Sequence, residues 1–186
     1  MALTESNMLA LGTIAPDFAL PNTIDDKIYT FADVASPKGT VVMFLCNHCP
    51  YVIYINAELV RLATEYQAKG IAFVAISSND AQKYPADAPD KMKIHAQEVG
   101  YTFPYLYDET QSVAKAYDAA CTPDFYVFDA QNKLAYRGQL DDARPSANRP
   151  ITGKDLRAAI DAILAGKSPN EVQRPSAGCN IKWKVN

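Results

Sequence analysis

The most constraining feature of the sequence is an apolar strand pattern that runs into a cysteine and a proline at the start of a helix. Thr40 to Leu45 (TVVMFL) is a continuous apolar run, which is typical of a strand buried on both faces. Cys49-Pro50 follows closely. An apolar stripe at spacings of three and four comes next, at Val52, Ile55, Leu59, Leu62 and Tyr66. Because proline suits the first helical position, the pattern predicts a helix that begins at Pro50.

A cysteine at this turn is expected to be the N-cap residue of the helix, with unsatisfied backbone N–H groups pointing toward its sulfur. Thiols in such places have pKa values lowered from about 8.5 toward roughly 3.5–7.5. A lowered pKa provides the thiolate that a nucleophilic cysteine needs. The alternative is a small buried thiol that only fills space. The strand–Cys-Pro–helix arrangement favours a reactive Cys49.

Cys46 lies three residues before Cys49, so the two form a Cys-x-x-Cys pair. Such a pair can close a short disulfide after Cys49 is attacked or oxidised. If Pro50 begins the helix, however, Cys46 lies outside it. Cys46 is then either a loop partner of Cys49 or a thiol that faces elsewhere, and we expect it to be the redox partner.

Strand and helix patterns alternate along the rest of the chain. Strands are expected at 71–77, 103–107, 124–129 and 133–138, and helices at 90–99, after 108 and from about 152 to 165. Capping boxes are expected at Asp108 with Gln111 and at Thr152 with Asp155. Residues 12–30 predict an extended hairpin, and the chain after Gly166 predicts a flexible tail. The pattern indicates an α/β fold, a central mixed β-sheet flanked by helices, in a single domain over residues 1–186.

Composition excludes several classes of function. The 186 residues are 48% hydrophobic and 21% charged, which is enough for one core and argues against disorder. The net charge is −3 and no basic cluster is present, so we expect no nucleic acid partner. Apolar runs fall short of the roughly 18 residues of a membrane helix, and Glu5 does not suit a secretion signal. A cytoplasmic protein without a membrane anchor is expected.

The four cysteines are too few to stabilise a chain of this length through structural disulfides, as proteins of oxidising compartments do. One of them begins the tripeptide Cys121-Thr122-Pro123, immediately before the strand expected at 124–129. Proline is permitted at the start of a strand. An X-Pro bond at such a place is also where a cis peptide occurs in a minority of cases.

The order of these elements resembles the thioredoxin fold: a strand, Cys-Pro, a helix, Thr-Pro before a hairpin, and a final helix. The opening GTIAPDFAL at 12–20 resembles the alkyl hydroperoxide reductase / thiol-specific antioxidant (AhpC/TSA) family, the peroxiredoxin-like branch of that fold. The segments NHCPYV at 47–52, CTPDFYVFD at 121–129 and PSAGCNIKWK at 175–184 resemble a peroxiredoxin-like group within it. The resemblance covers nearly the whole chain.

The resemblance implies that Cys49 is the reactive cysteine and that Thr122-Pro123 is a cis-proline element that lies beside its sulfur and pairs with bound substrate. It implies that Cys121 lies at the rim of the site, as a resolving thiol or an inert neighbour. His48 and Pro50 flank Cys49 and are also expected at the substrate. His48 either stabilises the thiolate, acts as an acid–base group near neutral pH, or faces solvent.

The chain departs from the peroxiredoxin pattern Pro-x-x-x-Thr-x-x-Cys and its distant arginine. Cys46 stands in the threonine place, Val42 in the proline place and Pro123 in the arginine place. The groups that stabilise charge on peroxide oxygens are therefore missing from their usual positions. This favours thiol–disulfide exchange over fast peroxide reduction.

The leading hypothesis is a thiol-dependent oxidoreductase of antioxidant type, without a cofactor. Its oxidant is a disulfide-containing protein or a small hydroperoxide, and a cellular dithiol restores the thiols. One alternative is a peroxiredoxin-like hydroperoxide reductase. Another is a copper or zinc protein that uses Cys46, His48, Cys49 and Cys121 as soft ligands. Cys179, in the tail, either reaches back as a resolving cysteine, pairs with another chain in a homodimer, or does nothing.

Overall fold

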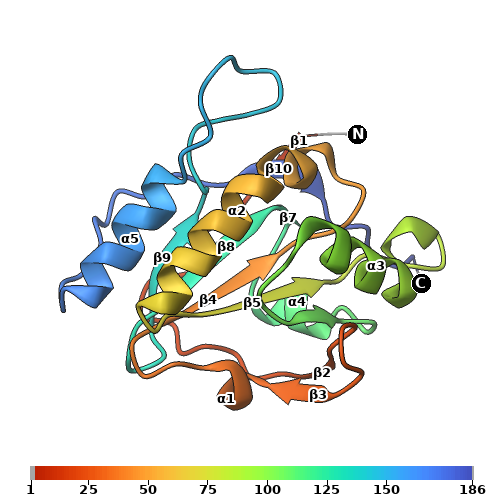
Figure 1. Cartoon of the computed structure of the whole chain (residues 1–186), viewed down its shortest axis with the longest axis horizontal. Coiled ribbons are helices and arrows are strands. Elements are labelled where there is room, and N and C mark those ends of the chain that lie inside the picture. The colour runs from red at the N-terminus through yellow and green to blue at the C-terminus, as the bar shows by residue number, and fades with distance from the viewer. Residues whose placement is uncertain (1–2, 186) are drawn as a thin grey trace.

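The computed structural model describes residues 3–185 and is built around a mixed five-stranded sheet (Figure 1). The sheet order is β6-β5-β4-β8-β9. The strands β4 (Thr40–Phe44), β5 (Ala72–Ser77) and β6 (Tyr105–Tyr107) run parallel, whereas β8 (Asp124–Phe128) and β9 (Leu134–Gly138) form an antiparallel hairpin beside β4. The strands expected from the apolar runs are therefore confirmed, with ends that differ by one or two residues.

Two layers of helices and loops cover the sheet. The long helices α2 (Pro50–Ala68), α3 (Pro89–Val99) and α5 (Lys154–Leu164) pack on one face. The short helices α1 (Phe31–Val34) and α4 (Ser112–Ala116) and the hairpin of β2 (Ala19–Pro21) with β3 (Ile28–Thr30) pack on the other. Alternation along β4 explains this division, because Val41 and Met43 point into the first layer and Val42 and Phe44 into the second. A 3-10 turn, η1 (Pro85–Asp87), precedes α3.

The chain after Gly166 is not a flexible tail, and this expectation was wrong. Residues Ala177–Asn180 form strand β10, which pairs on one side with β1 (Leu3–Glu5) and on the other with β7 (Cys121–Thr122). Residues beyond β10 are anchored as well, since the Gln111 side chain donates to Lys182 O at 2.9 Å and accepts from Lys184 N at 2.9 Å. Both ends of the described chain thus meet in a small second sheet (Figure 1).

Neither expected capping box forms in full. At α4 the Asp108 carboxylate does accept from the backbone N–H of Ala114 at 2.9 Å, but the Gln111 side chain does not reciprocate. Gln111 is itself the N-cap of α4, in the left-handed region at φ 63°, and its side chain is turned toward the C-terminal segment. At α5 the N-cap is Gly153, at φ 65°. The buried Asp141 carboxylate accepts from the N–H groups of Thr152 and Gly153, both at 2.7 Å. The backbone N–H groups of Asp155 and Leu156, in the first turn of α5, donate to the carbonyl of Leu140, both at 3.2 Å, so a backbone carbonyl takes the place of the expected Thr152 side chain.

Within 3–185, no helix combines the length and the hydropathy needed to cross a bilayer.

Candidate thiol–disulfide site

Cys49 lies at the junction between the central strand and the longest helix, as the sequence predicts. It is the N-cap of α2, with extended backbone angles of φ −73° and ψ 122°, and Pro50 is the first helical residue. The Cys49 sulfur makes no capping hydrogen bond, however. The stabilisation of a Cys49 thiolate must therefore come largely from side chains around it rather than from a direct helix cap.

Thr122 is the residue on which the Cys-x-x-Cys pair converges. The Thr122–Pro123 peptide bond is cis, as the resemblance implied. The Cys46 Sγ lies 3.3 Å from the Thr122 hydroxyl, and the protonated Cys49 Sγ can donate to the Thr122 carbonyl oxygen, also at 3.3 Å. Cys46 therefore faces the same element as Cys49, although it lies outside the helix.

A third thiol reaches this point from the end of the chain. In the antiparallel pairing of β10 with β7, Cys179 lies directly opposite Thr122. Cys46, Cys49 and Cys179 are buried in one core cluster. The sequence left the place of Cys179 open, because nothing local in Ala-Gly-Cys-Asn marks a strand or its register.

The electrostatics single out Cys49 among the three thiols. Hydrogen bonds from Cys179 and from Cys46 hold the pKa of Cys49 well below its usual value, and the backbone N–H of Val52 acts in the same direction, against the effect of burial. The pKa values of Cys46 and Cys179 are raised in turn, first by their hydrogen bonds to Cys49 and then by burial. Of the three thiols, Cys49 is therefore the one whose pKa favours the thiolate.

Cys121 lies close in sequence but has different neighbours. Its Sγ lies 3.8 Å from the Pro123 carbonyl and 4.0 Å from that of Ser176. It is not part of the core cluster that holds the other three cysteines. Burial, followed by the nearby Asp124, raises the pKa of Cys121. The resolving role expected for Cys121 stays a prediction, and these contacts do not favour it.

His48 is paired with a buried carboxylate on the other side of the loop. Its Nδ1 lies 2.6 Å from the Oδ2 of Asp87, and its ring stacks on Tyr84 at 5.8 Å between centroids. The hydrogen bond with Asp87 raises the pKa of His48. Asp87 also accepts from the backbone N–H of Asn47 at 2.8 Å and from Asn79 at 2.7 Å, so it fixes the loop between Cys46 and Cys49.

A metal ion could find three ligands here. One atom each of Cys46, His48 and Asp87 lies within 4.8 Å of the others. Sulfur, imidazole and carboxylate ligands together suit zinc better than copper(I). Of the four expected metal ligands, this cluster contains Cys46 and His48. Asp87 is the third ligand, and Cys49 and Cys121 are not part of the cluster.

Comparisons with known proteins agree with this geometry. The model of the AhpC/TSA family matches residues 11–137, which is more than half of the chain. The chain belongs to the AhpC/TSA family. A thiol-disulfide oxidoreductase ResA from Geobacillus thermodenitrificans is 25% identical over 134 residues, which cover 70% of each protein.

Solved structures give the fold. An uncharacterized conserved protein from Geobacillus kaustophilus is 59% identical, with a TM-score of 0.98 over 100% of this chain and 98% of that one. A hypothetical protein from Sinorhizobium meliloti is 47% identical, with a TM-score of 0.95 over 98% and 100%. The thioredoxin domain of an oxidoreductase from Bacteroides vulgatus shares the fold at 15% identity, with a TM-score of 0.61 over 80% of this chain and 96% of that one. The thioredoxin-like fold expected from the sequence is thus confirmed.

The part of the chain matched by the AhpC/TSA model includes Cys46, Cys49 and Thr122 but ends before β10. Cys179 therefore lies outside the matched region.

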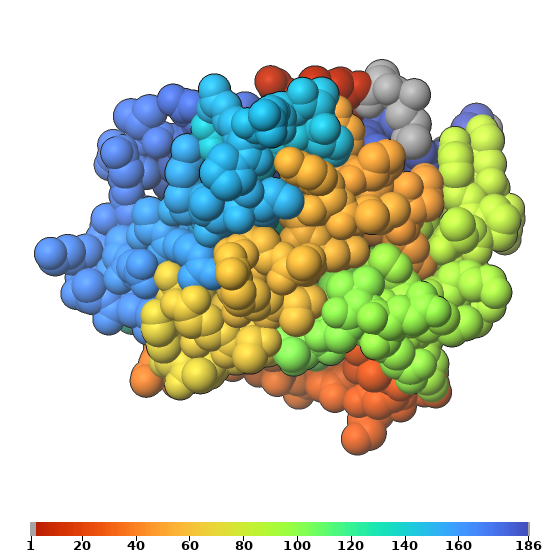
Figure 2. Space-filling view, turned by 45° about the horizontal axis from the view of Figure 1, so that its top comes forward, coloured from red at the N-terminus to blue at the C-terminus, as the bar shows by residue number. Residues whose placement is uncertain are grey.

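The thiols of this AhpC/TSA protein are closed off from solvent. None of the four cysteines is more than 3% exposed. A shallow groove is bounded by Tyr51, Tyr54, Pro123 and Arg144. Figure 2 shows the segment around residues 140–150 against the start of α2. The Arg144 guanidinium is held by the carbonyls of Asp141 and Ala143, both at 2.7 Å, and so is anchored in this loop.

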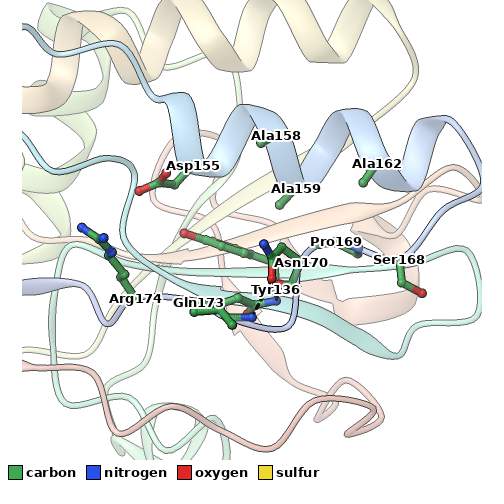
Figure 3. A pocket seen from close by; sticks show the side chains of 11 residues that line it. Tyr136, Asp155, Ala158, Ala159, Ala162, Ser168, Pro169, Asn170, Gln173 and Arg174 are labelled. Atoms are coloured by element: carbon green, nitrogen blue, oxygen red, sulfur yellow. Dashed lines mark hydrogen bonds between the residues drawn. The ribbon is translucent and has the colours of Figure 1, made fainter.

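A roomier cavity, of about 280 Å³, lies elsewhere in the molecule. Figure 3 shows it between α5, with Ala159 and Asp155, and the segment that carries Asn170 and Gln173. No cysteine is among the residues that line it.

Proposed function

We propose that the protein is a thiol–disulfide oxidoreductase in which Cys49 is the nucleophile. The observation that carries this proposal is the Cys49 sulfur itself, placed at the start of α2 beside the cis Thr122–Pro123 bond with its pKa held low by Cys46 and Cys179. A thiolate at neutral pH is the attacking species in disulfide exchange. The similarity to a ResA supports the same chemistry.

The first step is an exchange of one sulfur–sulfur bond for another. The Cys49 thiolate attacks one sulfur of a substrate disulfide, a mixed disulfide forms, and the other substrate sulfur leaves as a thiolate. A thiol of the protein then displaces the bound substrate sulfur, and the protein keeps a disulfide. A cellular dithiol returns this disulfide to the reduced state, which makes the protein a carrier of two electrons.

The test compares the thiol reactivity of the reduced wild-type protein with that of variants. Oxidised glutathione is the disulfide probe, and peptide mass spectrometry under non-reducing conditions identifies the cysteine that reacts. We expect wild type and Cys121→Ser to react much faster than a free thiol at pH 7, and Cys49→Ser to lose this reaction. Equal rates for wild type and Cys49→Ser would refute the proposal.

Hydroperoxide reduction is the second candidate, because the chain is an AhpC/TSA protein. Against it, the Thr122 hydroxyl is engaged with Cys46, at 3.3 Å from its Sγ. The strongest influences on the Cys49 pKa are thiols, burial and backbone N–H groups, with no arginine among them. We expect hydrogen peroxide to oxidise Cys49 no faster than it oxidises a free thiolate. A much faster reaction would support the hypothesis that the protein is a peroxidase with an antioxidant role.

Metal binding is tested separately through the ligand cluster. Reduced protein is titrated with Zn²⁺ against a chromophoric chelator, and Asp87→Asn is compared with wild type. Tight binding that Asp87→Asn weakens would favour the zinc alternative, whereas exchange chemistry does not require it. The cytoplasmic location, the homodimer and the particular oxidant and reductant stay predictions.

A further inference from the structure

Strand β10 occupies the edge of the cis-proline element. Its register places Cys179 opposite Thr122 and Asn180 opposite Cys121, so the backbone that could pair with an outside peptide is paired with the chain's own C-terminal segment. On its other side β10 pairs with β1, which places Leu3 opposite Cys179. Cys179 is thus held from both sides next to the sulfur that reacts first.

The approach of β10 to this element depends on a glycine. A Cβ atom built on Gly178 would lie 2.0 Å from the Thr122 carbonyl oxygen and 3.2 Å from the Pro123 ring. No side chain fits there unless β10 moves away from β7. Gly178 therefore permits the close contact that brings Cys179 to Cys49.

We propose that Cys179 is the resolving thiol of this site and that it closes an intramolecular disulfide with Cys49. The proposal rests on the proposed function and deepens it. Once Cys49 is bound to a substrate sulfur, the Cys179 thiolate attacks the Cys49 Sγ and the bond between Cys49 and the substrate breaks. The substrate sulfur leaves as a thiolate, and the proton of Cys179 passes to solvent or to that leaving sulfur. The two protein sulfurs are oxidised and the substrate disulfide is reduced to two thiols.

The charges around the thiols explain why Cys179 resolves only after Cys49 has reacted. The hydrogen bond to Cys49 and the negative charge of Cys49 are two of the three causes that raise the pKa of Cys179. Both are lost when Cys49 becomes a mixed disulfide. The nearby Lys182 ammonium, which lowers the pKa of Cys179, remains. The resolving thiol is thereby activated by the first step.

Cys46 is in a less favourable position for the same role. Cys46 lies in the loop before α2, which Asp87 holds through the backbone N–H of Asn47 at 2.8 Å, and its Sγ is engaged with the Thr122 hydroxyl at 3.3 Å. Cys179 instead lies on β10, directly opposite Thr122. Cys46 acts as a hydrogen-bond donor that prepares the Cys49 thiolate.

The experiment maps the product of the reaction with oxidised glutathione in four proteins. Wild type, Cys46→Ser and Cys121→Ser are each expected to give a disulfide between Cys49 and Cys179. Cys179→Ser is expected to stop at a stable adduct of glutathione on Cys49. A disulfide between Cys49 and Cys46 in wild type, or full release of glutathione by Cys179→Ser, would overturn the assignment while leaving Cys49 as nucleophile. Failure of Cys49 to form any adduct in Cys179→Ser, in a folded protein, would overturn the proposed function as well.

A second variant tests the strand without removing a thiol. Gly178→Ala keeps all four cysteines but forces β10 away from Thr122, so we expect the glutathione adduct on Cys49 to persist at least tenfold longer than in wild type. Gly12→Ala is the control, because a Cβ atom there meets nothing within 4 Å. Circular dichroism shows whether both variants are folded. Resolution by folded Gly178→Ala at the wild-type rate would contradict the role of β10.

Discussion

A buried carboxylate beneath the cis-proline element gives the sharpest prediction about stability. Asp124 follows Pro123 directly and is fully buried. Its carboxylate accepts from the hydroxyls of Ser6 at 2.8 Å and Tyr126 at 3.0 Å and from the N–H of Phe125 at 3.1 Å. Burial nevertheless outweighs these bonds and raises the pKa of Asp124 from 3.8 to about 7.

The sign of the effect follows from proton binding. Between pH 4 and pH 7 the folded protein keeps the proton on Asp124, whereas the unfolded chain has lost it. The free energy of unfolding therefore falls as pH rises through this window, by about 1.4 kcal/mol per pH unit. Over the interval from 3.8 to about 7, the loss amounts to about 4 kcal/mol.

The perturbation is Asp124→Asn, which keeps the shape of the side chain and cannot ionise. Urea unfolding of reduced protein at several pH values gives the difference in stability between variant and wild type. This difference is expected to shift in favour of the variant by about 4 kcal/mol between pH 4 and pH 8. Lost hydrogen bonds only add an offset that does not depend on pH. Asp26→Asn, at an exposed residue with φ 63° that asparagine tolerates, serves as control. A constant difference for Asp124→Asn would refute the reasoning.

Two further predictions concern other single positions. Gly138→Ala should destabilise the protein by several kcal/mol more than Gly12→Ala, as measured by urea unfolding. Both glycines have positive φ, but only a Cβ at 138 would meet a carbonyl oxygen, that of Arg174 at 2.0 Å. Equal effects of the two substitutions would show that the clash is relieved. Asp87→Asn should lower the pKa of His48 toward 6.5, since Asp87 is the largest cause that raises it; an unchanged His48 titration by NMR would show that the ion pair does not form in solution.

The sequence was sufficient for the central sheet and for the place of Cys49. Each of these depends on a local signal: an apolar run for β4, an apolar stripe for α2, and the fixed φ of Pro50 for the helix start. A proline also marked the cis-proline element. Local chemistry decided these features, so a local pattern could reveal them.

The second sheet could not be predicted, because its pairings join the two ends of the chain. Strands β1, β7 and β10 have only two to four residues each and no apolar alternation, and the register that sets Cys179 against Thr122 exists only in three dimensions. The pairing of His48 with Asp87 has the same origin, since the two residues lie 39 positions apart in the sequence. The incomplete capping boxes show the reverse case, in which the Leu140 carbonyl at α5 and the C-terminal segment at Gln111 outcompete a local partner.

The state of the three thiols also sets the direction of electron flow. A thiolate exists only in the reduced protein, so every hydrogen bond to the Cys49 thiolate stabilises the reduced form relative to the disulfide. Stabilisation of the reduced form makes a disulfide more oxidising. The protein is therefore expected to act as an acceptor of electrons from strong dithiol reductants, with a potential that depends on its donors.

Cys46 provides the test of this argument, since it donates to Cys49 without joining the disulfide assigned to Cys179. A hydrogen bond to a charged group is worth about 1.5–3 kcal/mol, which equals roughly 30–60 mV for a two-electron couple. Cys46→Ala loses the donor, so its potential, measured against a glutathione redox buffer, should be more negative than that of wild type by this amount. Cys46→Ser retains a hydroxyl donor and should stay near the wild-type value. If neither variant formed a disulfide, Cys46 itself would be one of its two sulfurs, and its role as a donor alone would be refuted.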